Sequence, residues 1–143
     1  MSRYVVDASV GIKWFLPEIH SEAASRLSFL KASLHVPAFF HLEIGNVLSK
    51  RIRRNELTLE EGETILKELK QIPLQKHSDE RLFNPAFALA LQTKQSLYDC
   101  LYLALAETID GQMVTADRKF YSSLASGEYG QRILWVEDVT KVK

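Results

Sequence analysis

Two acidic residues of this 143-residue chain directly follow short apolar segments. Asp7 follows residues 4–6, and Asp117 follows residues 112–115, so each lies just past a candidate strand. Asp is a good helix N-cap, and each residue could cap a helix that begins beside it. In a parallel sheet, both would also lie at the carboxyl ends of strands, where open α/β sheets bind ligands. The two interpretations are compatible.

A third acid, Glu43, is expected on the apolar side of a helix. In a helix predicted over residues 38–54, it is three residues after Phe40 and four before Val47. A lone carboxylate on a buried face costs several kcal/mol unless it is paired or bound to a cation. The alternative is a position at the edge of that face, from which the carboxylate reaches solvent.

A fourth acid, Asp99, is the only charged residue in the segment 97–106. A helix that is apolar nearly all round is expected to be central in the fold. Ser96 and Asp99 also fit a capping box, which would place Asp99 in the first turn of this helix. Capping does not conflict with a role in a site.

Four carboxylates packed together would repel one another and raise each other's pKa. A bound divalent cation removes that cost. An all-oxygen set without a Cys or His cluster favours Mg²⁺ or Mn²⁺ over Zn²⁺. Magnesium held by carboxylates usually serves phosphate chemistry, because it activates a bound water and stabilises the charge of an in-line displacement.

The elements that would position these acids alternate between short strands and helices. Strands are predicted at 4–6, 34–36, 74–76, 112–115 and 132–136, and helices at 18–32, 38–54, 59–70, 79–93, 97–110 and 117–124. Pro37 suits the first turn of the helix over 38–54. Thr58 and Glu61 form a capping-box pattern before the next helix. The alternation predicts an α/β layer structure with a mostly parallel sheet.

Composition limits the class of protein. A chain of 143 residues fits one domain over 1–143, and 46% apolar with 25% charged residues is typical of a globular protein. The single cysteine, Cys100, excludes an internal disulfide framework and favours the cytoplasm. We expect no signal peptide and no membrane span. Eighteen basic residues balance eighteen acidic ones, which argues against nucleic-acid binding by bulk charge.

Four motifs, taken in their order along the chain, resemble those of the PIN-domain ribonucleases. The resemblance is to the VapC-type toxins of prokaryotic toxin–antitoxin pairs in particular. The resemblance covers nearly the whole chain. The motifs are Val5-Val6-Asp7-Ala8-Ser9-Val10 with Lys13-Trp14-Phe15; Val36-Pro37 with Glu43 and Asn46-Val47-Leu48; Tyr98-Asp99-Cys100-Leu101-Tyr102-Leu103-Ala104-Leu105-Ala106-Glu107; and Val114-Thr115-Ala116-Asp117 with Phe120. Cys100 replaces an alanine that is frequent in the family, and we expect it to be a small buried residue.

The resemblance implies a three-layer PIN-like fold, with a small central parallel sheet flanked by helices. It also implies metal-dependent endonucleolytic cleavage of RNA by water, which leaves 5′-phosphate and 3′-hydroxyl ends. The acids that match the family's positions for one or two Mg²⁺ or Mn²⁺ ions are Asp7, Glu43, Asp99 and Asp117. Ser9 and Thr115 match hydroxyl residues of the pocket. Family members usually form homodimers, and a small antitoxin encoded beside them blocks the site.

Several residues are candidates for contacts with RNA or partner proteins. The densest basic cluster lies at 50–54, at the end of the Glu43 helix, where it also interacts favourably with the helix dipole. The candidates for phosphate contact are Lys13, Arg53, Arg54 and Arg118. Trp14 and Phe15 are expected in the core, although with the 18–32 helix they could line a dimer or antitoxin groove.

Two other functions remain open at this point. A phosphoacceptor receiver domain also uses acids at strand ends, but it would need an adjacent acidic pair after the first strand. Here Asp7 stands alone. A PIN-type fold kept only as a binding scaffold is the second alternative, and the complete set of four acids argues against it.

Overall fold

The computed structural model describes residues 2–139; Met1 and residues 140–143 of the predicted 1–143 domain lie outside them. The centre of the molecule is a five-stranded sheet in which every pairing is parallel. In spatial order the strands are β3 (Leu74–His77), β2 (Ala32–Pro37), β1 (Ser2–Val6), β4 (Gln112–Thr115) and β5 (Ile133–Trp135). The chain moves from β1 to β2 and β3 on one side, and then returns to β4 and β5 on the other. The strand order therefore reverses between β1 and β4, which is where such sheets form ligand sites.

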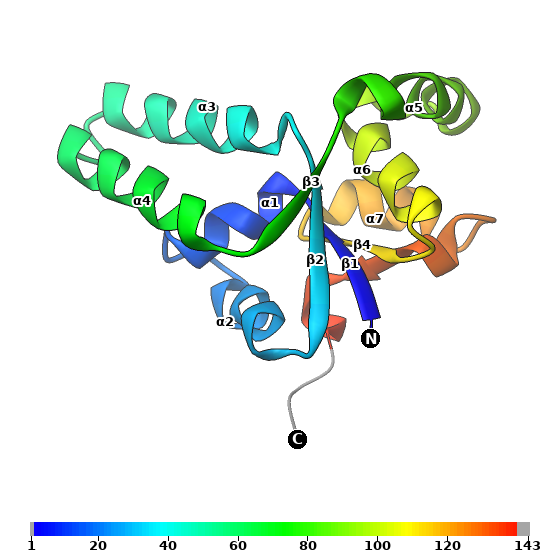
Figure 1. Cartoon of the computed structure of the whole chain (residues 1–143), viewed down its shortest axis with the longest axis horizontal. Helices are drawn as coiled ribbons and strands as arrows, with labels where there is room; N and C mark the ends of the chain where they lie inside the picture. The colour runs from blue at the N-terminus through cyan, green and yellow to red at the C-terminus, as the bar shows by residue number, and fades with distance from the viewer. Residues whose placement is uncertain (1, 140–143) are drawn as a thin grey trace.

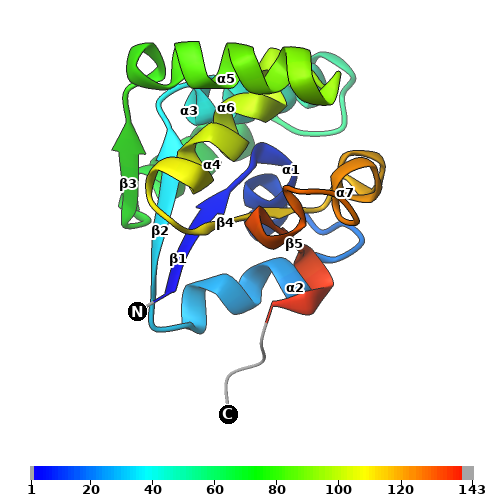
Figure 2. The same cartoon turned by 90° about the vertical axis from the view of Figure 1, so that its right-hand side faces the viewer.

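Helices cover both faces of this sheet and complete three layers (Figures 1 and 2). On one side lie α1 (Ala8–Gly11), α2 (Ser21–Ser25) and a hairpin of α3 (Phe40–Arg53) and α4 (Leu59–Gln71). On the other side lie α5 (Asp79–Thr93) and α6 (Leu97–Thr108), and α7 (Arg118–Leu124) packs near β5. Short 3₁₀ turns are η1 (Ile12–Trp14), η2 (Arg26–Phe29), η3 (Gly130–Arg132) and η4 (Val136–Asp138).

The α6 helix is the central helix, as its apolar sequence predicts. Seven consecutive residues of this helix, 100–106, are buried, and α6 contacts β1, β2 and β4. Val5 and Val6 of β1 and Val114 of β4 are fully buried in the sheet core. Burying a Val or Leu side chain contributes roughly 1.5–3 kcal/mol, so this contact fixes α6 against the centre of the sheet. Because α6 begins at Leu97, its first turn holds Asp99 over the carboxyl ends of the strands.

The order of strands in the sheet tests the receiver-domain alternative. The observed order is 3-2-1-4-5, whereas receiver domains have the flavodoxin-like order 2-1-3-4-5. The receiver-like alternative is therefore wrong for this fold. None of the helices in the described part of the chain is long and apolar enough to cross a membrane.

Two boundary predictions are wrong. The helix expected over 18–32 is instead the short α2 followed by η2, and the chain is already extended at Leu30. Pro37 does not open the helix over 38–54, because it is the last residue of β2 and pairs with His77. The amide of Ala38 donates to the His77 carbonyl at 2.8 Å, so the strand ladder continues past the proline and α3 begins only at Phe40.

The capping box before α4 is confirmed. The Glu61 amide donates to Thr58 Oγ1 at 3.0 Å, and the Thr58 amide donates to Glu61 Oε1 at 2.9 Å. These bonds satisfy two amides at the start of α4, which would otherwise lack partners. The turn between α3 and α4 is thereby fixed, and the two helices pack as a hairpin.

Candidate active site

The structure brings all four predicted acids to one cavity of about 200 Å³ at the carboxyl ends of β1 and β4. Asp7 comes from the junction of β1 and α1, and Asp117 from the junction of β4 and α7. Glu43 lies in the first turn of α3, and Asp99 in the first turn of α6. The other lining residues are Ala8, Ser9 and Tyr102. Four separate elements thus contribute one carboxylate each.

Asp7 is the buried acid of the cavity, with 5% of its surface exposed. Its Oδ1 accepts hydrogen bonds from the Val10 amide at 3.1 Å and from Ser9 Oγ at 2.5 Å. Burial raises the pKa of Asp7 to about 6; hydrogen bonds from Ser9, Thr115 and Val10 oppose this rise, and the nearby charge of Asp99 adds to it. The carboxylate therefore caps α1 and also carries an unfavourable buried charge.

The two predicted hydroxyl residues connect the strand ends that carry Asp7 and Asp117. Ser9 Oγ accepts from the Ala116 amide at 3.0 Å while it donates to Asp7. Thr115 is fully buried, and its Oγ1 accepts from the Asp117 amide at 3.1 Å. These bonds hold the β1–α1 and β4–α7 junctions in a fixed relation.

Asp117 is exposed and caps α7, because its Oδ1 accepts from the Phe120 amide at 3.1 Å. Ser96 caps α6, but only half of the predicted capping box forms, because the Asp99 carboxylate accepts from the Ser96 hydroxyl instead of from the Ser96 backbone amide. The Asp99 amide donates to Ser96 Oγ at 3.1 Å, and Ser96 Oγ donates to Asp99 Oδ2 at 3.0 Å. Burial raises the pKa of Asp99, and the charge of Asp117 contributes to the rise. Asp117 is thus both a helix cap and a cavity residue, whereas Asp99 lines the cavity and bonds the cap residue Ser96.

Glu43 is held by a residue that the sequence did not assign to the site. Tyr102 Oη donates to Glu43 Oε1 at 2.6 Å, and the tyrosine is 2% exposed. Burial raises the pKa of Glu43, and the charge of Asp99 adds to this rise. The sequence does contain a signal for Tyr102, because a tyrosine inside an apolar helix needs a buried acceptor for its hydroxyl. Tyr102 also lies one turn after Asp99, on the same face of α6.

The charge of the cavity is not neutralised by protein cations. Across residues 2–139, no ion pair involves any of the four acids. In the same range, no three His, Cys, Asp or Glu side chains already stand in ligating positions. Each carboxylate instead accepts a hydrogen bond from a protein donor: Asp7, Asp99 and Asp117 from donors within three residues, and Glu43 from Tyr102. The donor set, four carboxylates with no sulfur or imidazole, fits a hard divalent cation that would replace some of these bonds.

The comparisons with known proteins agree with this geometry. The family model of the PIN domain matches residues 4–123. Ribonuclease VapC3 of Pyrobaculum aerophilum is 38% identical over 119 residues, which cover 82% of this chain and 91% of the relative. The chain belongs to the PIN-domain family, within its VapC group. Ribonuclease VapC3 of Mycobacterium tuberculosis is 30% identical over 117 residues, which cover 82% of this chain and 84% of the relative.

Solved structures show the same PIN fold. PAE2754 from Pyrobaculum aerophilum superposes with a TM-score of 0.69 at 22% identity, covering 95% of this chain and 90% of its own. VapC20 of Mycobacterium tuberculosis, described as a sarcin-ricin loop cleaving toxin, gives a TM-score of 0.66 at 14% identity. The match covers 85% of this chain and 95% of VapC20. A chain of a toxin–antitoxin complex from Klebsiella pneumoniae gives a TM-score of 0.64 at 14% identity. The match covers 97% of this chain and 99% of that chain.

The four basic residues predicted to contact RNA phosphate lie in different surroundings in this PIN domain. The Lys13 side chain is 9% exposed and its Nζ lies 3.2 Å from Glu18 Oε1, so it is engaged within the protein. The Arg118 guanidinium lies over the Trp135 ring at 3.9 Å from its centroid. Arg53 and Arg54 are exposed at the end of α3. Contact with RNA stays a prediction for all four residues.

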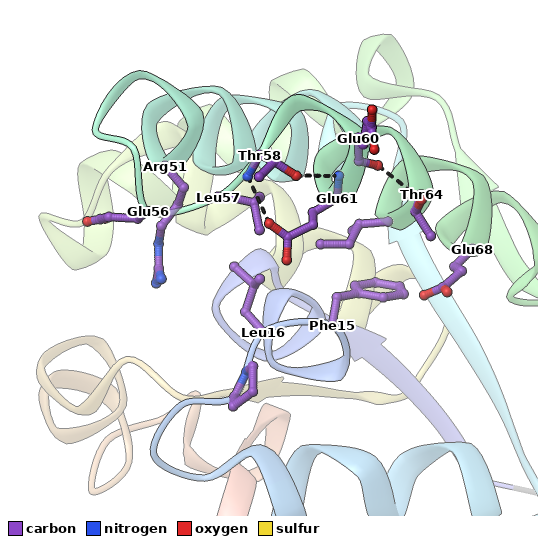
Figure 3. A pocket seen from close by; sticks show the side chains of 12 residues that line it. Phe15, Leu16, Arg51, Glu56, Leu57, Thr58, Glu60, Glu61, Thr64 and Glu68 are labelled. Carbon is purple, nitrogen blue, oxygen red and sulfur yellow. Dashed lines mark hydrogen bonds between the residues drawn. The ribbon is translucent and has the colours of Figure 1, made fainter.

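A larger cavity, of about 650 Å³, lies between residues 15–17 and the α3–α4 hairpin, and contains none of the four acids (Figure 3). Phe15 and Leu16 line its lower side, and Leu57 lies above Leu16. Its acidic lining residues are Glu56, Glu60, Glu61 and Glu68. This larger cavity is therefore apolar at its base, and its four glutamates outnumber the one cationic lining residue, Arg51.

Proposed function

We propose that this PIN-domain chain is a cytoplasmic, metal-dependent endoribonuclease and the toxin of a toxin–antitoxin pair. The observation that carries the proposal is the meeting of four unneutralised carboxylates in one cavity at the reversal point of the sheet. The names of the relatives, which are ribonucleases, set the class of reaction. The remaining alternative, a PIN fold kept only as a binding scaffold, predicts no cleavage.

Asp7, Glu43, Asp99 and Asp117 would hold Mg²⁺ or Mn²⁺. When bound, the cation would supply an activated water at neutral pH and stabilisation of the charge on the phosphodiester. The protein's own hydroxyls orient the acids. Ser9 and Thr115 fix Asp7, and Tyr102 fixes Glu43. This preorganisation is the contribution of the fold to the reaction.

Purified protein incubated with RNA tests the proposal. Cleavage is expected in Mg²⁺ or Mn²⁺ and should disappear in EDTA. RNA that stays intact at every metal concentration would support the scaffold alternative.

Replacing Tyr102 with phenylalanine should weaken the apparent metal affinity about 10- to 100-fold, because Glu43 loses the hydroxyl that orients it. The ring stays in the core, so folding should be unaffected. The measurement is the Mn²⁺ dependence of cleavage. Tyr129→Phe is the matched control, since that hydroxyl bonds Gln92 on the surface. An unchanged metal dependence in Tyr102→Phe would show that Glu43 needs no such support.

We propose that a small cognate antitoxin blocks the enzyme. The neighbouring structures include toxin–antitoxin complexes, which supports such a partner. The larger cavity offers an apolar base formed by Phe15, Leu16 and Leu57, with glutamates around it (Figure 3). These features suit a segment that carries apolar residues flanked by Lys or Arg.

We also propose that the chain forms a homodimer through the outer face of α5. Phe83, Phe87 and Leu91 are 48%, 51% and 68% exposed at a four-residue spacing, and no charged residue occurs from 82 to 93. Figure 2 shows α5 along the outside of the described chain, with no other helix or strand above it in this view. Such an uncharged apolar stripe is typical of an interface.

The apolar stripe of α5, together with Glu80 and the C-cap residue Lys94, is symmetric in its spacing about Phe87. Phe83 and Leu91 each lie four residues from it, and Glu80 and Lys94 each lie seven residues from it. An antiparallel two-fold pairing centred on Phe87 therefore places Phe83 against the partner's Leu91 and Glu80 against the partner's Lys94. This charge and apolar complementarity favours a second copy of the chain as the partner.

Phe87→Lys should convert the dimer into monomers, because the pairing would bring two lysines together at its centre. Sedimentation velocity or light scattering measures this change. Phe29→Lys is the matched control, since Phe29 is 73% exposed on η2, away from α5. A wild-type monomer, or a dimer that survives in Phe87→Lys, would contradict the α5 interface.

A further inference from the structure

A third cavity, which is less acidic, adjoins the cavity that holds the four acids. It measures about 330 Å³ and is lined by Phe39, Leu42, Glu43, Asn46 and Tyr98. Glu43 lines both cavities, so they meet at this residue. Glu43 is also the only charged residue that lines this third cavity. The other lining residues are aromatic or apolar, apart from the amide of Asn46.

Two of the lining side chains are unusually exposed for their type. Leu42 is 76% exposed and Tyr98 is 62% exposed. Leu42 precedes Glu43 in the first turn of α3, and Tyr98 precedes Asp99 in the first turn of α6. Each exposed apolar side chain thus stands beside an acid of the candidate site. Because both line the same cavity, they form one exposed, largely apolar patch beside the acids, and such a patch is typical of a ligand-binding surface.

The base of this cavity is fixed by aromatic packing. The Phe39 ring is 8% exposed, and it lies 5.8 Å from the Tyr98 ring and 5.2 Å from the Tyr102 ring, measured between centroids. Tyr102 is the residue that holds Glu43. One aromatic cluster therefore connects the apolar cavity to the acidic site, and holds both in place.

We propose that this cavity seats one unpaired nucleobase of the RNA substrate, next to the phosphodiester that is cleaved; the inference rests on the proposed ribonuclease function. Tyr98 supplies a ring on which the base stacks, and Leu42 lies against it. The lining disfavours a phosphate, because its one charge is the negative Glu43, whereas a base is flat and neutral. Single-stranded RNA is recognised through such stacked, unpaired bases.

Asn46 gives the cavity a means of choosing among bases. Its amide carries both donors and an acceptor, so it can bond the edge of a stacked base. It lies on α3, three residues after Glu43, and so faces the same side of the helix. The base beside the cleaved bond should therefore be the position of strongest sequence preference.

The first test measures binding of a short fluorescein-labelled single-stranded RNA by fluorescence anisotropy in EDTA, where cleavage is absent. Tyr98→Ala should weaken binding about 10- to 100-fold, and Tyr98→Phe should restore most of the affinity because the ring is kept. Phe29→Ala, on a different exposed surface, is the control and should bind as the wild type does. Equal binding by Tyr98→Ala and wild type, or no wild-type binding, would overturn the proposal.

A cleavage assay in Mn²⁺ separates this proposal from the proposed function. Asn46→Ala should change which base is preferred at the cut, with the metal dependence unchanged. Cut sites that are identical in Asn46→Ala and wild type would remove the role of Asn46. RNA binding that depends on Tyr98, without cleavage by the wild type, would reject the ribonuclease function while keeping the base site.

Discussion

Replacing Asp7 with asparagine is expected to lower the rate of RNA cleavage by about 10²- to 10³-fold while leaving the fold intact. Asparagine keeps the size of the side chain and the Oδ1 that accepts from Ser9 and Val10. What it removes is the negative charge that a bound cation requires. The initial rate of cleavage in Mn²⁺ measures the effect, and circular dichroism checks the fold.

Asp110→Asn is the matched control for this loss. It makes the same chemical change in a side chain that is 79% exposed and pairs with Arg132, outside the cavity. Asp110 has a φ of 54°, a conformation that asparagine tolerates well. This control should cleave at the wild-type rate. If Asp7→Asn cleaved as fast as Asp110→Asn, Asp7 would have no part in the chemistry.

In EDTA, the protein is expected to lose about 3 kcal/mol of stability as the pH rises from below 4 to above 6, because of Asp7. Burial raises the pKa of Asp7 from 3.8 to about 6, which corresponds to about 3 kcal/mol. The folded state then binds this proton more tightly than the unfolded state does. Stability therefore falls as the pH rises through this window, and the full cost is present above about pH 6.

Urea unfolding of wild type and Asp7→Asn, across this pH range in EDTA, measures the effect of Asp7 alone. The asparagine variant should become the more stable of the two as the pH rises. Adding Mn²⁺ at neutral pH should stabilise the wild type, since a ligand that binds only the folded state favours folding. Parallel pH profiles for the two proteins would show that the buried charge of Asp7 carries no cost.

Local patterns in the sequence predicted most of the elements. The apolar run 97–106 predicted the buried α6, and the spacing of Thr58 and Glu61 predicted the start of α4. Glu43 and Asp99 were assigned to the site through the resemblance to the PIN-domain ribonucleases, whereas Asp7 and Asp117 could be placed together because parallel strands end at the same edge of a sheet. That rule needs only strand order and chain direction.

The parts that the sequence did not predict depend on contacts between distant segments. Tyr102 and Glu43 are 59 residues apart, and no local spacing indicates that they meet. Pro37 stays in β2 because the next residue bonds to β3, a contact that propensity alone does not contain. Glu18 pairs with both Lys13 and Arg51, and its pairing with Arg51, 33 residues away, has no signal in local spacing. Each depends on tertiary packing.

Mapping of new 5′ ends in RNA tests whether the four acids form a metal-dependent nuclease site. Total bacterial RNA would be incubated with antitoxin-free wild type in Mn²⁺, with wild type in EDTA, and with Asp99→Asn in Mn²⁺. We expect discrete new 5′-phosphate ends only with wild type in Mn²⁺. The same ends from Asp99→Asn, or from wild type in EDTA, would contradict a metal-dependent site built from these four acids.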